Sequence, residues 1–133
     1  MTKLFLSVLF WGMSFPTPAK LKVIVRDIEV GKGSVVLAVY DNPNNFLKKA
    51  VVEQRAKAGK QSLEFSLDLP EGNYAIAIYQ DLNDNKKFDK GWFGIPTEPY
   101  GLSNNVRPKF SAPGFEDCKC KIAQLTTTTI HLK

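Results

Sequence analysis

The chain has 133 residues and carries 18 Lys and Arg against 13 Asp and Glu, which gives a formal net charge of +5 at pH 7. That length suits one domain and argues against a multidomain architecture. The basic residues are scattered and no nucleic-acid-binding motif accompanies them, so the charge does not indicate a nucleic-acid partner.

The first residues have the pattern of a secretory signal peptide. Lys3 precedes an apolar run over residues 4–15, and the small and proline residues 16–19 follow it. The run is shorter than the roughly 20 residues that a membrane span needs. We therefore expect a signal peptide over 1–19 and a secreted or periplasmic domain over 20–133, with no stable membrane span after cleavage. A retained anchor is the alternative.

The first half of the chain predicts strands joined by turns. Residues 21–27 alternate between apolar and polar types, as a half-buried strand does. Residues 34–41 are apolar on both faces, which predicts a central strand. The next segment fits helical and strand periods equally well, and we favour a helical turn near 45–49 followed by a strand over 50–58. We expect that strand to form a hairpin with residues 62–67.

Tyr74 marks the entry to another strand. Gly72 stands two residues before it, as in the tyrosine corner of Greek-key sandwiches. We expect the Tyr74 hydroxyl to bond an upstream backbone group and to serve architecture, not catalysis. Residues 74–80 then predict a second central strand.

The second half predicts a long connection and a closing pair of strands. Residues 90–114 show no sustained period but contain several aromatic residues, so we predict a packed loop over one end of the fold. Residues 116–122 and 125–132 are the final pair of strands. The predicted fold is all-β, a single antiparallel Greek-key β-sandwich of immunoglobulin or transthyretin type with about seven strands.

The two cysteines, Cys118 and Cys120, stand two residues apart on the predicted strand 116–122. Such residues share one face about 7 Å apart, at the upper limit for a disulfide. We therefore expect buried free thiols and no redox or metal function.

Oxygen-bearing side chains follow the predicted strand 74–80 at regular spacing, in residues 81–89, which we call the Asx loop. Asp81, Asn83 and Asn85 occupy positions 1, 3 and 5 of the calcium-loop pattern. The carbonyl of Lys87 and the carboxylate of Asp89 would supply positions 7 and 9.

The Asx loop departs from an EF-hand at two positions. Lys86 replaces the turn glycine, and Trp92 replaces the closing glutamate. Bound Ca²⁺ would therefore be weak, with Kd about 10⁻⁴–10⁻³ M, and would need another carboxylate. The candidates are Glu98, Glu116 and Asp117. The equal alternative is a loop without metal, in which Asp81 accepts hydrogen bonds from the loop's own amides.

Several motifs occur together in one order, namely Leu69-Pro70-x-Gly72-x-Tyr74, the Asx loop, Phe93-Gly94-Ile95-Pro96, Glu98-x-Tyr100-Gly101-x-Ser103-Asn104-Asn105 and Pro113-x-Phe115-Glu116-Asp117. In this order they resemble the DUF2141 family of small exported bacterial proteins. The resemblance implies a secreted, β-sandwich-like domain of the bacterial envelope. It implies no activity, because none is established for the family.

The motif content argues against an enzyme. His131 is the only histidine, and no Ser-His-Asp or Cys-His pairing has a recognisable context. Asp81 with Asp89 or Asp117 could do acid–base work, which is the less favoured alternative of a carboxylate-dependent hydrolase. We favour a non-enzymatic exported domain that acts as an envelope accessory or binding module.

A glycan- or protein-binding module is the other alternative. Trp92, Phe93 and Tyr100 lie in the long predicted loop, where exposed aromatics could stack on sugars or pack against proteins. Burial of these rings beneath the loop is the interpretation we favour. Asn104 and Asn105 either bond loop backbone, as we favour, or line a polar pocket beside the Asx loop. The expected partner is an envelope protein or a glycan.

Overall fold

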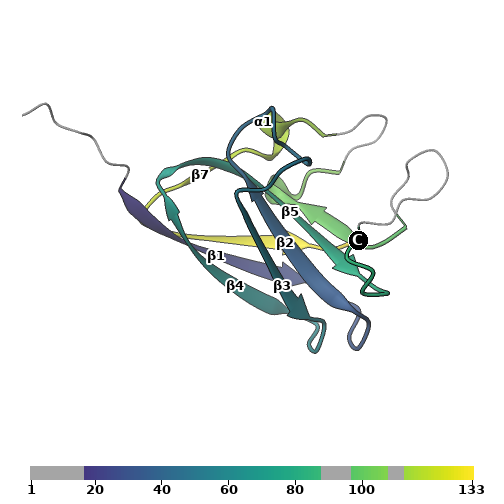
Figure 1. The fold of residues 1–133 in the computed structure, drawn as a ribbon. Coiled ribbons are helices and arrows are strands. Elements are labelled where there is room, and N and C mark those ends of the chain that lie inside the picture. The colour runs from purple at the N-terminus through teal and green to yellow at the C-terminus, as the bar shows by residue number, and fades with distance from the viewer. Residues whose placement is uncertain (1–16, 88–96, 108–112) are drawn as a thin grey trace, which may run out of the picture.

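The computed structural model describes residues 17–87, 97–107 and 113–133 of the chain, and most of them form β-strands (Figure 1). The strands are β1 (Pro18–Arg26), β2 (Ser34–Tyr40), β3 (Val52–Lys57), β4 (Leu63–Pro70), β5 (Gly72–Asp81), β6 (Tyr100–Leu102), β7 (Cys120–Ile122) and β8 (Leu125–His131). A one-turn helix, α1 (Phe115–Cys118), and a 3-10 turn (Ser103–Asn105) accompany them.

The strands form two sheets. The three-stranded sheet has the order β4-β1-β8, with β1 antiparallel to β4 and parallel to β8. The five-stranded sheet has the order β3-β2-β5-β6, and β7 pairs with the beginning of β5. All pairs of this second sheet are antiparallel. The predicted all-β sandwich is confirmed, and the parallel β1–β8 pair is the departure from a purely antiparallel fold.

The main core lies between the two sheets. Alternate residues of each strand point to the same face, so β1, β4 and β5 direct Val, Leu and Ile inward. The fully buried inward residues include Leu21, Val23, Leu37, Ile76 and Ile130. This core fixes the ends of the strands, and the connecting loops are held relative to it.

A second, smaller cluster covers the other face of the five-stranded sheet at one end. Phe46 packs edge-on against Tyr40, with ring centroids 5.4 Å apart, and against Phe115 at 6.0 Å. Figure 1 shows α1 lying with the β2–β3 connection at this end of the sheet. Because both its faces are covered, β2 is buried along its whole length.

Three predicted strands are confirmed. Residues 21–27 lie mostly in β1, and residues 34–41 correspond to β2. Residues 74–80 lie within β5, and β2 and β5 are both central in their sheet. The Tyr74 hydroxyl donates to the Pro70 carbonyl at 2.6 Å, which confirms the expected bond to upstream backbone.

The predicted hairpin between 50–58 and 62–67 is wrong. β3 pairs with β2, whereas β4 pairs with β1 in the other sheet. The connection between them therefore crosses from one sheet to the other. Two backbone bonds hold that connection against the β1–β2 loop, from Gly31 N–H to the Ala58 carbonyl at 2.7 Å and from Ile28 N–H to the Gln61 carbonyl at 3.1 Å.

The predicted closing pair of strands also needs correction. Residues 115–118 form α1 instead of a strand, and the Asp117 carboxylate accepts a bond from Gly114 N–H at 3.1 Å at the start of this helix. β7 then pairs with β5, and β8 pairs with β1. The two segments therefore belong to different sheets.

Both cysteines are free thiols, as predicted. Cys118 is fully buried in the smaller cluster, whereas Cys120 is half-buried and packs against the main core. The helical turn separates the two side chains onto different faces, which corrects the expectation of a shared face. Burial, with smaller contributions from Asp117 and Cys120, raises the pKa of Cys118 to about 11.

The long loop predicted over 90–114 contains regular structure, because β6 and the 3-10 turn lie inside it. Residues 88–96 and 108–112 are outside the described residues, as are residues 1–16 of the predicted signal peptide. β1 begins at Pro18, within the last residues assigned to that peptide. Among the described residues, no helix is long and apolar enough to cross a membrane.

Candidate functional site

The described part of the Asx loop is built on one buried carboxylate. Asp81, the last residue of β5, is 0% exposed. Its carboxylate accepts hydrogen bonds from Lys86 N–H at 2.8 Å and Asn85 N–H at 3.2 Å. Arg55 Nη1, from β3 on the far side of β2, donates to Asp81 Oδ2 at 3.1 Å. One guanidinium and two amides therefore surround this buried charge.

The remaining loop residues bond to one another's backbone. Asn83 Oδ1 accepts from Asn85 N–H at 3.3 Å, and Asn85 Oδ1 accepts from Lys87 N–H at 2.9 Å. These are Asx turns, the pattern of the metal-free alternative. Lys86 has φ 63°, so a lysine takes the left-handed conformation that the calcium pattern assigns to glycine.

Three residues outside the predicted set complete this polar cluster. The Ser34 hydroxyl donates to Asp84 Oδ1 at 2.7 Å, and Arg55 Nη1 lies 3.5 Å from the same oxygen. Glu98, one of the carboxylates considered from sequence, is 5% exposed and accepts from Leu82 N–H at 2.8 Å. Sequence reasoning missed Ser34, Arg55 and Asp84. These residues are far apart in the chain, and they meet only because β3, β2 and β5 are consecutive strands of one sheet.

Two further residues fix the start of the Asx loop. Gly33 has φ +62°, and a Cβ at this position would lie 1.8 Å from the Asp81 carbonyl oxygen. Gln80 is 0% exposed, and its amide donates to the carbonyls of Glu29 and Lys32, both at 2.7 Å. Its carbonyl oxygen accepts from Glu29 N–H at 2.9 Å. The β1–β2 loop is thereby bonded to the end of β5.

The described residues do not fit a calcium site in this arrangement. The oxygens of Asp81 already accept three N–H donors, and Arg55 places positive charge where a cation would bind. Asp117 lies beside the opposite end of β5, because β7 pairs with residues 72–74 while Asp81 is the last residue of that strand. No group of three or more His, Cys, Asp and Glu that could hold a metal occurs within the described residues. Asp89 lies outside them.

The predicted binding residues separate into two groups. Trp92 and Phe93 lie outside the described residues. Tyr100 is half-buried, and the guanidinium of Arg107 stacks on its ring at 4.7 Å. This stacking gives Tyr100 a structural contact at the junction of β6 and the chain end.

Asn104 and Asn105 bond to backbone, which is the role we favoured. Asn104 Nδ2 donates to the carbonyls of Asp117 at 3.1 Å and Lys119 at 3.0 Å. Asn105 Nδ2 donates to the Thr129 carbonyl at 3.2 Å, and its oxygen accepts from His131 N–H at 3.1 Å. The two asparagines therefore connect the 3-10 turn with α1 and with β8.

The outer face of the three-stranded sheet carries a different set of polar side chains. Outward positions alternate with core positions along β1, β4 and β8. We call this surface the polar face, and its residues are Lys20, Lys22, Ile24, Arg26, Glu64, Ser66, Asp68, Leu125, Thr127, Thr129 and His131. Lys22 Nζ lies 3.4 Å from the Glu64 carboxylate, and Leu125 is 63% exposed.

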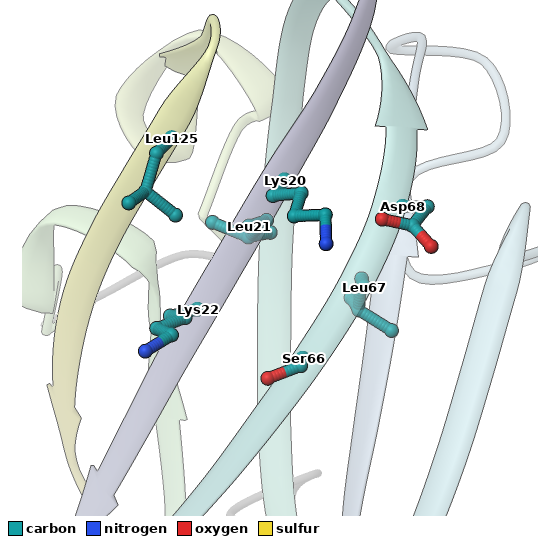
Figure 2. A pocket seen from close by; sticks show the side chains of 7 residues that line it. All are labelled: Lys20, Leu21, Lys22, Ser66, Leu67, Asp68 and Leu125. Carbon is teal, nitrogen blue, oxygen red and sulfur yellow. The ribbon is translucent and has the colours of Figure 1, made fainter.

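A shallow hollow of about 190 Å³ lies on the polar face. Figure 2 shows Leu125 of β8, two lysines of β1 and the β4 residues Ser66 and Asp68 around it. Its volume is below the roughly 300–1,000 Å³ of an enclosed ligand pocket. The hollow therefore suits one group of a larger ligand that lies across the face. Alternation in the predicted strands indicated a polar exterior, but the pairing of β8 with β1 was not predictable.

A family model described as an uncharacterized protein conserved in bacteria (DUF2141) matches residues 23–131. No curated protein and no solved structure matches the chain. The match spans β2 to β8 completely and the last part of β1, from Val23 onward.

Proposed function

The chain belongs to the DUF2141 family, and we propose that it is a non-catalytic binding module of the bacterial envelope that contacts a glycan through its polar face. The protein would act after export, with the Asx loop serving as architecture. The alternative partner is an envelope protein, and the test must distinguish it from a glycan.

The observation that supports this proposal is the difference between the two sheet surfaces. The smaller apolar cluster covers the outer side of β2 and β5 at one end. The polar face has no such cover among the described residues, and it combines Lys, Ser, Asp and Thr side chains with the exposed Leu125. Hydroxyl-rich ligands use such mixed donors and acceptors, and an apolar side chain can pack against a sugar ring.

The chemistry of the remaining polar groups supports a role without catalysis. Asp81 and Gln80 are fully buried and bonded to neighbouring backbone. His131 pairs with Asp27 at 2.8 Å on the surface. With a pKa of about 11, Cys118 keeps a protonated thiol at neutral pH, and a protonated thiol is a poor nucleophile.

A titration observed by amide NMR tests the proposal. The ¹⁵N-labelled protein would be mixed with soluble fragments of bacterial envelope polysaccharides, and we expect saturable shifts at Lys20, Lys22, Ser66 and Leu125. The variant Lys20→Ala/Lys22→Ala should lose binding. The charge-matched control Lys48→Ala/Lys49→Ala changes two exposed lysines on the β2–β3 connection and should retain it. Shifts confined to other surfaces, or no binding by any fragment, would reject the polar face as a glycan site.

A further inference from the structure

We propose that β3 is a dimerisation edge, through which two copies of this chain pair their β3 strands antiparallel and join their five-stranded sheets. This inference concerns a surface separate from the polar face, and it does not depend on glycan binding.

The strand order gives β3 one open side. β3 stands at the end of the order β3-β2-β5-β6 and pairs with β2 over residues 52–57. Within the parts of the chain that the structure describes, no other strand pairs with it. An open strand edge presents backbone N–H and carbonyl groups that can bond to another strand.

The outward side chains of β3 are complementary to themselves. Glu53, Arg55 and Lys57 alternate with the half-buried Val52, Gln54 and Ala56. If a two-fold axis passes through Arg55, Glu53 of each copy lies opposite Lys57 of the second copy. Directly opposed residues have Cβ atoms about 4.5–5.5 Å apart, and opposite charges there stabilise a strand pair. The dimer would contain two such pairs.

The two Arg55 side chains would meet at the axis, and their charges are already balanced. Each guanidinium lies 3.1 Å from its own Asp81 and 3.5 Å from its own Asp84. The centre of the paired edge is therefore not an unopposed pair of cations. In the same register Gln54 lies opposite Ala56, so small and polar side chains face each other on the inner side.

The other described sheet edges do not combine an open side with self-complementary charges. On β4, an antiparallel pair centred on Ser66 would place Glu64 opposite Asp68, and like charges at opposed positions repel. The edge of β8 is bonded by Asn105 at the Thr129 carbonyl and the His131 amide. β6 has three residues, and Tyr100 exchanges two backbone bonds with Lys133. β3 alone, among the described edges, combines an open side with a self-complementary charge pattern.

Sedimentation velocity over a wide range of protein concentration tests this proposal. We expect a reversible monomer–dimer equilibrium, because one short strand pair is a small interface. Glu53→Lys and Lys57→Glu should each raise the dimer Kd by about tenfold or more, since each change replaces two attractions with two repulsions. The double variant Glu53→Lys/Lys57→Glu restores opposite charges and should recover most of the wild-type affinity.

The control is Lys60→Glu, which makes the same charge change at an exposed residue beyond β3. It should leave the Kd within about twofold of wild type, because surface charges away from the interface contribute little. Circular dichroism of each variant checks that the fold is intact. A monomer at all concentrations would overturn the proposal, as would a dimer that the β3 reversals leave unchanged or that the double variant fails to restore.

Discussion

At the residue scale, the end of β5 is held by the buried carboxylate of Asp81, which accepts hydrogen bonds from Arg55 and from the amides of Asn85 and Lys86. Asp81 was predictable as an anchor because short polar residues follow an apolar strand. Its partner Arg55 was not predictable, because the two residues are 26 positions apart in the chain. The predicted hairpin also placed the strand that contains Arg55 beside residues 62–67, whereas it pairs with β2. Lys86 could not be assigned a left-handed φ either, because that conformation favours glycine and here the surrounding bonds impose it.

At Gly33, the addition of a single methyl group should strongly destabilise the fold. A methyl group at this position would overlap the Asp81 carbonyl, and φ +62° disfavours any side chain. We expect Gly33→Ala to lower the free energy of unfolding by more than about 2 kcal/mol. Urea denaturation measures this directly.

The matched control is Gly31→Ala. Gly31 has φ +84°, but a Cβ on this residue would have no atom within 4 Å, so only the backbone cost of about 1–2 kcal/mol applies. Equal losses for the two variants would show that the contact with Asp81 contributes nothing.

Arg55 should decide whether the Asx loop responds to calcium. The Arg55 guanidinium is paired with the Asp81 carboxylate. Arg55→Met removes that partner from a buried charge, so we expect it to lower the free energy of unfolding by about 1–3 kcal/mol. It should also make the carboxylate accessible to a cation. Thermal unfolding in EDTA and in CaCl₂, with MgCl₂ as a control, should then show a larger Ca²⁺-dependent rise in Tm for the variant than for wild type. A wild-type rise as large as that of the variant would instead support the calcium site predicted from the sequence.

At the element scale, strands were predictable and their partners were not. β1, β2 and β5 follow from alternation and apolar runs, which are local signals. The pairing of β4 with β1, and of β8 parallel to β1, depends on chain crossings between sheets that no local pattern records. α1 was missed because it is a single turn, and its last residue, Cys118, continues the alternation of Cys120 and Ile122 that predicted a strand over 116–122.

Ser103 connects the 3-10 turn with β5 and α1, and it should contribute more to the free energy of unfolding than an exposed serine does. Its hydroxyl is fully buried, accepts from Ile76 N–H of β5 at 2.9 Å and donates to the Cys118 carbonyl at the end of α1. Ser103→Ala would leave a buried donor and a buried acceptor without their partner, so we expect a loss of about 1–3 kcal/mol in unfolding free energy. Ser66→Ala, at an exposed position of β4, should change it by less than about 0.5 kcal/mol. A similar effect of both variants in chemical denaturation would refute this role.

At the scale of the whole molecule, hydrogen bonds link the two sheets to each other along the side formed by β6 and β8. Tyr100 of β6 and Lys133 exchange backbone bonds at 3.1 and 3.3 Å, which links the five-stranded sheet to the end of β8. Arg107 adds bonds to the carbonyls of Tyr100 at 2.8 Å and His131 at 3.0 Å. On the side formed by β3 and β4, the β3–β4 connection joins the two sheets at one end, and the strand order of the described residues leaves the edge of β3 open there for the proposed dimer.

Gly101 tests how closely the two sheets must approach on the joined side. A Cβ on this residue would lie 2.6 Å from Ile130 Cγ2 and 2.7 Å from the His131 carbonyl oxygen, so Gly101→Ala must push β6 away from β8. We expect a loss of more than about 2 kcal/mol in unfolding free energy, together with faster hydrogen exchange at the amides of Tyr100 and Lys133. Gly72→Ala is the control in another strand, where the nearest atom is 3.5 Å away, and it should cost less than about 1 kcal/mol. If exchange at those two amides stayed at wild-type rates in Gly101→Ala, the close contact between β6 and β8 would not be what joins the sheets.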